Sequence, residues 1–200
     1  MYDQQRIIRE EVRGHILKAI DRHRPEATGI GLINRGLTHL GIRLQDDELV
    51  GHLKYLADKD ILSSANRGAD WSLTPYGVDV VEGSVERPPG IPEMSMLSHA
   101  EVQRRCEIRW RILTVLDITR TTGSLGETVQ NCLSDVDFVV SDKELNREMD
   151  YLSAKNLVLW KGDTASLEWS AYLTVEGADV VDYENDAPAG LARPKKFWEG

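Results

Sequence analysis

The sequence predicts an α+β fold, mainly α-helical with small β-hairpins, in which one compact unit occurs twice. Three observations support this prediction. Apolar residues recur at helical spacing along much of the chain, and short β-prone runs flank turn residues. The stretch LTPYGVDVVEG at 73–83 returns as LTVEGADVVDY at 173–183. Two copies are too few for a solenoid, so a duplicated compact domain is the better interpretation.

The repeat can be followed along most of each half. From about residue 13 to residue 62 the chain matches itself 96 positions further on without a gap. The offset is 98 where Trp71 aligns with Trp169, and 100 where Leu73 aligns with Leu173. Since insertions are tolerated in loops, the extra residues of the second copy predict a longer β-hairpin there.

The first two helices of the first copy are indicated by their apolar spacing. A helix over 5–21 carries an inward stripe that includes Ile8, and it ends before a proline. A second helix over 29–40, which Thr28 can cap, carries a stripe that includes Leu40.

A third helix and a hairpin follow. The helix opens at Gln45 or Asp46 and runs to about Lys59, and the acidic residues of its first turn suit the helix dipole. Strands are expected at about 61–65 and 71–73, on either side of an Asn-Arg-Gly turn.

The repeated LT stretch predicts a short closing helix. Thr74 is expected as its N-cap, Pro75 as its first residue and Gly83 in the left-handed conformation just past its end. Three helices, a two-stranded hairpin and a closing helix make a winged helix. The second copy repeats this order, with helices over 101–120, 124–135, 142–155 and 175–183 and strands over 157–161 and 167–173.

The chain is therefore predicted to hold two tandem winged-helix domains, over residues 1–87 and 101–186. Residues 88–100 contain three prolines and are expected to form a semi-rigid linker. Residues 187–200 are expected to form a basic, aromatic C-terminal tail, interpreted either as a docking peptide or as a loosely ordered end.

Both copies resemble the small winged-helix proteins encoded by Mu-like phages and prophages. Three stretches carry the resemblance: the third helix running into its strand (DDELVGHLKYLADKDIL and DKELNREMDYLSAKNLV), the LT stretch, and the tail after it (RPPGIP and APAGLARPKK). This chain departs from the family in its tandem arrangement and in Asp182-Tyr183, where Glu-Gly is expected. The resemblance implies a phage or prophage origin and supplies no catalytic residues.

Composition narrows the function classes. With only Cys106 and Cys132, a disulfide framework is excluded, and no run approaches the roughly 18–20 apolar residues of a membrane span. No phosphate loop, nucleophile elbow or pair of metal ligands at the usual spacing is present. We therefore expect a cytoplasmic protein that is not an enzyme and has no metal, cofactor or small-molecule substrate.

Basic residues on the first helix of each copy form the first candidate site. They are interpreted as a docking face for an acidic partner, or as a solvated face paired with neighbouring glutamates. The candidate residues are Arg6, Arg9, Arg13, Arg104, Arg105 and Arg109.

A DNA-binding site is the alternative. The third helix of a winged helix usually enters the major groove, yet both third helices begin with acidic residues, and the net charge of the chain is −9. The remaining candidate DNA contacts are Arg67, Lys143, Asn146, Arg147 and Lys161. Trp71 and Trp169 are expected at matching wing positions, where they pack the hairpins onto the helices.

The sequence thus favours a non-enzymatic binding protein, an adaptor or assembly module with a protein partner. A DNA-binding regulator or accessory factor is the second hypothesis. Homo-oligomerisation is left open.

Overall fold

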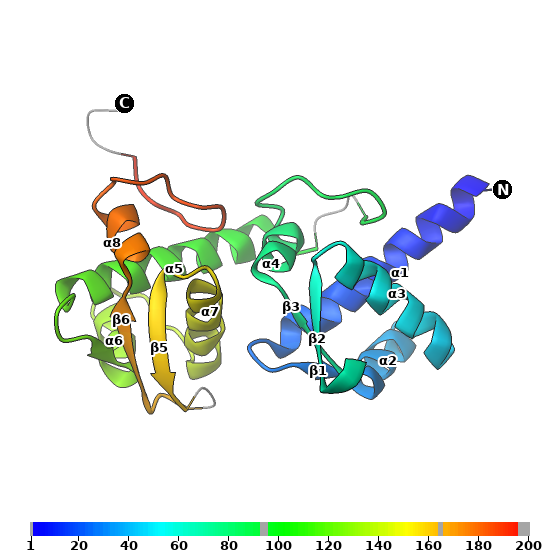
Figure 1. Cartoon of the computed structure of the whole chain (residues 1–200), viewed down its shortest axis with the longest axis horizontal. Helices are drawn as coiled ribbons and strands as arrows, with labels where there is room; N and C mark the ends of the chain where they lie inside the picture. The colour runs from blue at the N-terminus through cyan, green and yellow to red at the C-terminus, as the bar shows by residue number, and fades with distance from the viewer. Residues whose placement is uncertain (1, 93–95, 164–165, 196–200) are drawn as a thin grey trace. The chain divides into compact units, whose positions relative to one another are not determined.

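The computed structural model describes residues 2–92, 96–163 and 166–195. The chain divides into two compact units, Met1–Ser98 and His99–Gly200, called unit 1 and unit 2 here. Each unit contains helices and one small antiparallel sheet (Figure 1). The predicted fold class, mainly α-helical with small β-hairpins, is therefore confirmed.

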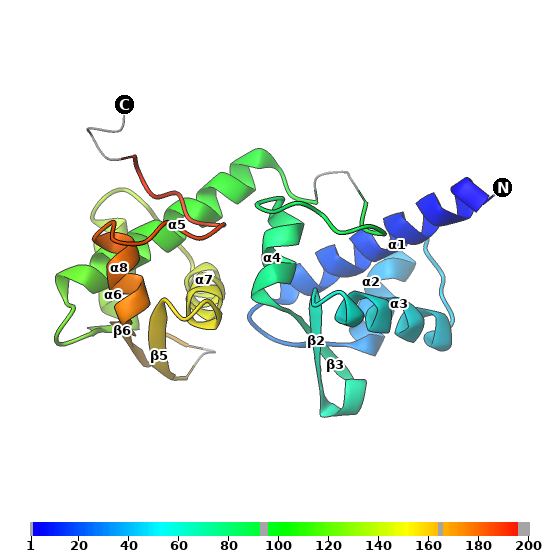
Figure 2. The same ribbon diagram turned by 45° about the horizontal axis from the view of Figure 1, so that its top comes forward.

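Unit 1 places three helices before a β-hairpin and one helix after it. Its elements are α1 (Tyr2–His23), β1 (Thr28–Gly29), α2 (Ile30–His39), α3 (Asp46–Asp58), β2 (Leu62–Ala65), the 3-10 turn η1 (Asn66–Gly68), β3 (Asp70–Leu73) and α4 (Pro75–Glu82). The sheet has the order β1-β3-β2. Figure 2 shows the β2–β3 hairpin projecting from the helices of this unit.

Unit 2 repeats the order of helices and strands. Its elements are α5 (His99–Ile118), β4 (Ser124–Leu125), α6 (Gly126–Ser134), α7 (Asp142–Ala154), β5 (Val158–Gly162), β6 (Trp169–Leu173) and α8 (Val175–Val181). The sheet order β4-β6-β5 matches that of unit 1. The repeat seen in the sequence therefore corresponds to a repeated arrangement of elements.

The core of unit 1 lies between α1, α2, α3 and the sheet. It contains the fully buried side chains of Ile16, Leu17, Ile20, Ile33, Leu37, Leu49, Leu53 and Leu56. In unit 2, α5 packs against α6, α7 and α8 and buries Ile108, Ile112, Leu113 and Leu116. In both units the apolar side chains that recur along the first helix lie on the buried face, as their spacing predicts.

A short strand precedes the second helix of each unit and was not predicted. Thr28 pairs with Trp71 in β1, and the N-cap of α2 is Gly29, so the prediction of Thr28 as the cap is wrong. Likewise, Ser124 and Leu125 belong to β4 rather than to a helix. Two residues are too few to give a period-2 pattern, and only pairing with the hairpin makes these segments strands.

The closing helix is as predicted. Thr74 Oγ1 accepts a hydrogen bond from Gly77 N at 2.9 Å, Pro75 is the first residue of α4, and Gly83 has φ 71°. Gly77 also has to be glycine, because a Cβ there would lie 2.0 Å from the carbonyl oxygen of Ile61. The repeated L-T-x-x-G motif therefore records a helix that starts in direct contact with the preceding strand.

The hairpin register corrects the alignment of the tryptophans. Trp71 pairs with Ser64, whereas the equivalent pair in unit 2 is Trp160 and Ala171. Trp71 therefore matches Ala171, and Trp169 lies two positions earlier on its strand. Because side chains alternate faces with period two, a shift by two keeps Trp169 on the inner face. Both tryptophans are buried, as expected, at 4% and 2% exposure.

The segment after α4 was expected to be a linker from residue 88 onwards, but it packs on unit 1. Tyr55 donates its hydroxyl hydrogen to Pro89 O at 2.9 Å, and Arg13 Nη1 donates to Gly90 O at 2.9 Å. Ile91 is 4% exposed. Prolines hold this backbone outside any helix, which leaves its carbonyl groups available to these donors. The boundary between the units lies at Ser98–His99 instead.

The segment after α8 packs on unit 2 in the same way. Tyr151 donates its hydroxyl hydrogen to Ala189 O at 2.8 Å, and Arg109 Nη1 donates to Gly190 O at 3.1 Å. Ala192 N donates to Cys106 O at 3.2 Å. Residues 187–195 are therefore part of the unit rather than a separate tail, and Trp198 lies outside the described residues.

Candidate functional site

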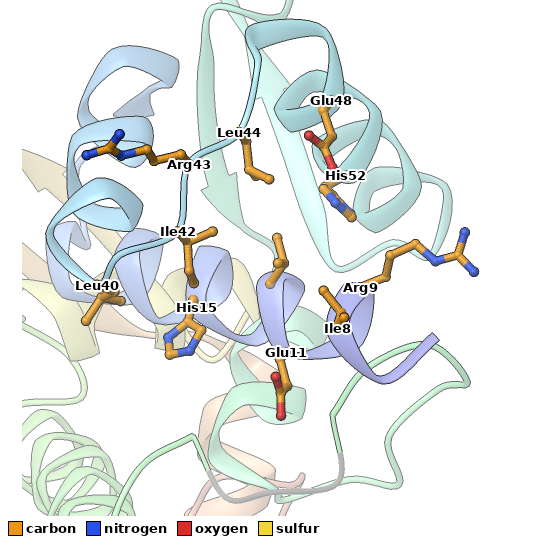
Figure 3. A pocket seen from close by; sticks show the side chains of 11 residues that line it. Ile8, Arg9, Glu11, His15, Leu40, Ile42, Arg43, Leu44, Glu48 and His52 are labelled. Atoms are coloured by element: carbon orange, nitrogen blue, oxygen red, sulfur yellow. The ribbon is translucent and has the colours of Figure 1, made fainter. Parts of the chain in front are cut away.

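A groove in unit 1 is the candidate functional site. It lies between α1, the connection from α2 to α3, and α3, and it encloses a cavity of about 470 Å³ (Figure 3). We call it the α1–α3 groove, lined by Ile8, Arg9, Glu11, Val12, His15, Leu40, Ile42, Arg43, Leu44, Glu48 and His52.

The floor of the groove is apolar. Val12 is buried and Ile42 and Leu44 are half-buried, whereas Ile8 and Leu40 are 53% and 58% exposed. The sequence placed Ile8 and Leu40 on the apolar stripes of their helices, and the structure leaves both residues exposed. The apolar stripes of α1 and α2 extend further than the core does, and their ends remain at the groove.

Charged residues surround this apolar floor. Arg9, Glu11, Arg43 and Glu48 are all exposed. Figure 3 shows the guanidinium groups of Arg9 and Arg43 directed away from the centre of the groove, with Ile42 and Leu44 towards it. An apolar floor with a mixed charged rim suits a protein partner that inserts an apolar side chain next to a charged one.

His52 belongs to the apolar part of the site. It is 7% exposed on α3. Burial lowers the pKa of its imidazole below the ordinary value, and the neighbouring Arg13 guanidinium lowers it further, whereas Glu48 opposes the shift. The folded protein therefore favours the neutral imidazole, which keeps a positive charge out of the groove wall.

Arg13, on α1, holds the segment that follows α4 against unit 1. The Arg13 guanidinium carbon lies 3.5 Å from the ring centre of Tyr55, and Arg13 also holds the carbonyl of Gly90. A Cβ on Gly90, whose φ is +88°, would lie 2.1 Å from the Tyr55 hydroxyl oxygen, so the motif requires glycine. We call Arg13, Tyr55 and Gly90 the arginine clamp of unit 1.

Unit 2 has the same clamp, formed by Arg109, Tyr151 and Gly190, with one addition. Arg109 Nε donates to Glu148 Oε2 at 2.6 Å, and both side chains are fully buried. In unit 1 the position of Glu148 is taken by His52, and Arg13 Nε is buried without a hydrogen-bond partner. The two units therefore differ in the charge of the side chain at one matched position, His52 in unit 1 and Glu148 in unit 2.

The expected basic docking face is contradicted by burial. Arg109 is fully buried and Arg105 is 6% exposed, while Arg13 belongs to the clamp. Arg104 is engaged by Glu144. Only Arg6 and Arg9 remain well exposed. The first helices bear arginines at matching positions because the fold uses two of them internally, and a repeated arginine in a sequence does not reveal this.

Asn146 and Arg147 are wrong as DNA contacts. Asn146 is 3% exposed, donates to Ser166 O at 2.9 Å and accepts from Trp169 Nε1 at 2.9 Å. Arg147 Nε donates to Glu148 Oε1 at 2.6 Å. Asn146 therefore ties α7 to the hairpin, and Arg147 lies against the buried carboxylate.

Three expected DNA contacts lie at the surface, on three different elements. Arg67 is in the turn η1 of unit 1, Lys161 is on β5, and Lys143 is in the first turn of α7 beside Asp142 and Glu144. No two of them share one element, so the structure gives no basic stripe along either third helix.

No protein-family model, curated protein or solved structure matches the chain. Among the residues that the structure describes, no group of three His, Cys, Asp or Glu side chains could hold a metal ion. Within the same residues, no helix is long and apolar enough to cross a membrane.

Proposed function

We propose that each unit is a winged helix and that the chain is a non-enzymatic binding protein, acting as an adaptor or assembly module. The repeated element order, with a three-stranded sheet of order β1-β3-β2, supports the winged-helix assignment. The resemblance to proteins of Mu-like phages supports a phage or prophage origin. The free cysteines Cys106 and Cys132 support a cytoplasmic setting.

The α1–α3 groove carries the proposal of a protein partner. Exposed Ile8 and Leu40 flank an apolar floor in a cavity large enough for side chains. Apolar pockets with a polar rim are typical of places where a partner inserts an anchoring side chain. Unit 1 therefore supplies the docking surface.

DNA binding is the weaker alternative. Asp46, Asp47 and Glu48 are exposed in the first turn of α3, where a winged helix would approach phosphates. Carboxylates at that position repel the DNA backbone, and two of the five expected DNA contacts are engaged within the fold.

Site-specific photo-crosslinking tests the proposal. A photoreactive amino acid at Leu40 should crosslink a partner protein in the cells that produce the chain. Leu125, which is 63% exposed in unit 2 and outside the groove, is the matched control position. Equal crosslinking at both positions, or none at Leu40, would refute the groove as the docking surface.

A DNA titration separates the two candidate functions. Fluorescence anisotropy with a random-sequence duplex at low salt should show no binding by the whole chain. Binding that weakens steeply as salt is added would show that phosphates are the partner and would replace the protein-adaptor proposal with the DNA-binding one.

A further inference from the structure

We propose that the α1–α3 groove receives an aromatic side chain of a partner protein together with a neighbouring arginine. The inference rests on the proposed function, since it names the partner chemistry of the same groove. It is drawn from unit 2, where side chains of the unit itself occupy the equivalent position.

Three groove positions of unit 1 have larger or more basic equivalents in unit 2. Residues 96 positions further on are Arg104 for Ile8, Arg111 for His15 and Phe138 for Ile42. Each substitution adds either an aromatic ring or a guanidinium group to the groove of unit 2.

These three side chains contact one another at the matching positions of unit 2. Arg104 Nε donates to Glu144 Oε1 at 3.0 Å, and Arg104 Nη2 donates to Val139 O at 2.7 Å. The guanidinium carbons of Arg104 and Arg111 lie 5.2 and 4.7 Å from the ring centre of Phe138. A half-buried aromatic ring between two guanidinium groups is a favourable cation–π arrangement. We call these three side chains the plug.

Unit 1 lacks the plug but keeps the groups that receive it. The equivalent of Glu144 is Glu48, and the equivalent of the Val139 carbonyl is the carbonyl of Arg43. Among the described residues, no hydrogen bond or ion pair engages the Glu48 carboxylate. An arginine brought by a partner would therefore find both of the acceptors that Arg104 uses.

Helix capping does not occupy Glu48 either. In unit 2, Glu144 completes a capping box with Ser141, whose backbone N–H donates to Glu144 Oε2 at 3.1 Å. In unit 1 the N-cap is Gln45, which makes no side-chain capping hydrogen bond. Glu48 therefore does not take part in a capping box, as Glu144 does in unit 2.

We infer an aromatic side chain in the partner because unit 1 lacks the ring that Phe138 supplies in unit 2. Ile42 stands where Phe138 stands in unit 2, and Ile8 cannot stack as Arg104 does. The cavity of about 470 Å³ over an apolar floor offers space for such a ring. At the Glu48 position an arginine is favoured over an acid, because an acid there would meet the Glu48 carboxylate, whereas the guanidinium groups of Arg9 and Arg43 are directed away from the centre of the groove.

The dipeptide N-acetyl-Phe-Arg-amide tests the proposal. Titrated into the whole ¹⁵N-labelled chain, it should give saturable NMR shifts at Ile8, Ile42 and Glu48, with a Kd of about 1 mM. N-acetyl-Phe-Glu-amide, the charge-reversed control, should bind at least about tenfold more weakly, since it loses a charge-assisted hydrogen bond.

Two matched variants exchange the side chains at the three plug positions between unit 1 and unit 2. I8R/H15R/I42F builds the plug into unit 1 and should abolish the shifts. R104I/R111H/F138I removes it from unit 2 and should create new shifts at Val136 and Glu144. If R104I/R111H/F138I fails to fold, I8R/H15R/I42F alone tests whether the dipeptide binds in the α1–α3 groove.

Several results would overturn the proposal. Equal affinity for the two dipeptides would mean a general apolar patch. Shifts that persist in I8R/H15R/I42F would place binding elsewhere. Self-association of the chain that this variant abolishes would assign the groove to a second copy. If Leu40 crosslinks a partner while the Phe-Arg dipeptide gives no shift, the groove docks proteins but the inferred chemistry is wrong.

Discussion

One matched position, His52 in unit 1 and Glu148 in unit 2, sets much of the difference between the two halves. Both residues lie on the third helix of their unit and face the arginine of the clamp. Glu148 neutralises Arg109 in a fully buried pair, whereas His52 stays neutral beside Arg13 and lines the groove. The same backbone position therefore carries half of a buried ion pair in one copy and a histidine in the wall of the α1–α3 groove in the other.

Unit 1 should lose stability as the solution is acidified. Burial and Arg13 lower the pKa of His52 in the folded state, so the unfolded chain binds its proton more readily. The stabilisation is present above the unfolded pKa of about 6.5 and is lost as pH falls below it.

Denaturant unfolding followed by the fluorescence of Trp71 measures this. His52→Gln should flatten the dependence, and His39→Gln, an exposed histidine of α2, is the matched control. An unchanged profile in His52→Gln would contradict the assignment.

Supplying the missing carboxylate should stabilise unit 1. His52→Glu reproduces the pairing of unit 2 and gives the buried Arg13 Nε an acceptor, with an expected gain of about 1–2 kcal/mol in unfolding free energy. The measurement is chemical denaturation at neutral pH. A destabilised variant would show that the space around Arg13 is not equivalent to that around Arg109.

Breaking the buried pair should be costly in unit 2. Glu148→Ala leaves the Arg109 charge buried and uncompensated, with an expected loss of about 3–5 kcal/mol. Glu10→Ala, which removes the half-buried i,i+4 partner of the exposed Arg6, is the control and should cost less than about 1 kcal/mol. Similar losses in both variants would mean that the buried pair has no special role.

At the scale of elements, the contact between each closing helix and the strand before it sets a strict size limit. Gly77→Ala would place Cβ 2.0 Å from the Ile61 carbonyl oxygen and should destabilise unit 1 by about 2–4 kcal/mol. Gly51→Ala on α3 has no heavy atom within 4 Å of the new Cβ and should instead stabilise by about 0.5–1 kcal/mol. Thermal unfolding of the two variants gives the comparison, and a stable Gly77→Ala protein would contradict the close approach.

The elements were largely predictable because their signals are local. The closing helix follows from Thr74, Pro75 and Gly83, each acting within a few residues of its own position. The strands β1 and β4 were missed because only pairing with a distant hairpin defines them. The groove was missed for a related reason, since helical spacing shows that Ile8 and Leu40 share a stripe but not where the core ends.

At the scale of the whole molecule, each duplicated unit extends beyond the predicted domain boundaries at residues 87 and 186. The repeat visible in the LT stretch ends near residue 83, yet the clamp uses Gly90 in unit 1 and Gly190 in unit 2. The offset of 100 between these glycines equals the offset at Leu73 and Leu173. The Pro-bearing segments are therefore matching parts of both copies, which composition alone made look like a linker and a tail.

Truncation distinguishes the two boundaries. A fragment of residues 1–98 should be more stable than one of residues 1–87, because the shorter fragment lacks the Gly90 acceptor and the buried Ile91. Removing a buried isoleucine and its contacts costs about 2–5 kcal/mol. Circular dichroism during urea unfolding provides the measurement, and equal midpoints would support the shorter boundary.

The side-chain arrangement of Arg104 and Phe138 in unit 2 also suggests the design of a synthetic antagonist. A constrained cyclic peptide that holds a guanidinium carbon about 5.2 Å from an aromatic ring centre would copy the geometry of Arg104 over Phe138. In the proposed binding mode such a compound would compete with a partner for unit 1, whereas the matching positions of unit 2 carry Arg104, Arg111 and Phe138. Selectivity between two otherwise similar halves would thus come from occupancy rather than from any difference in backbone.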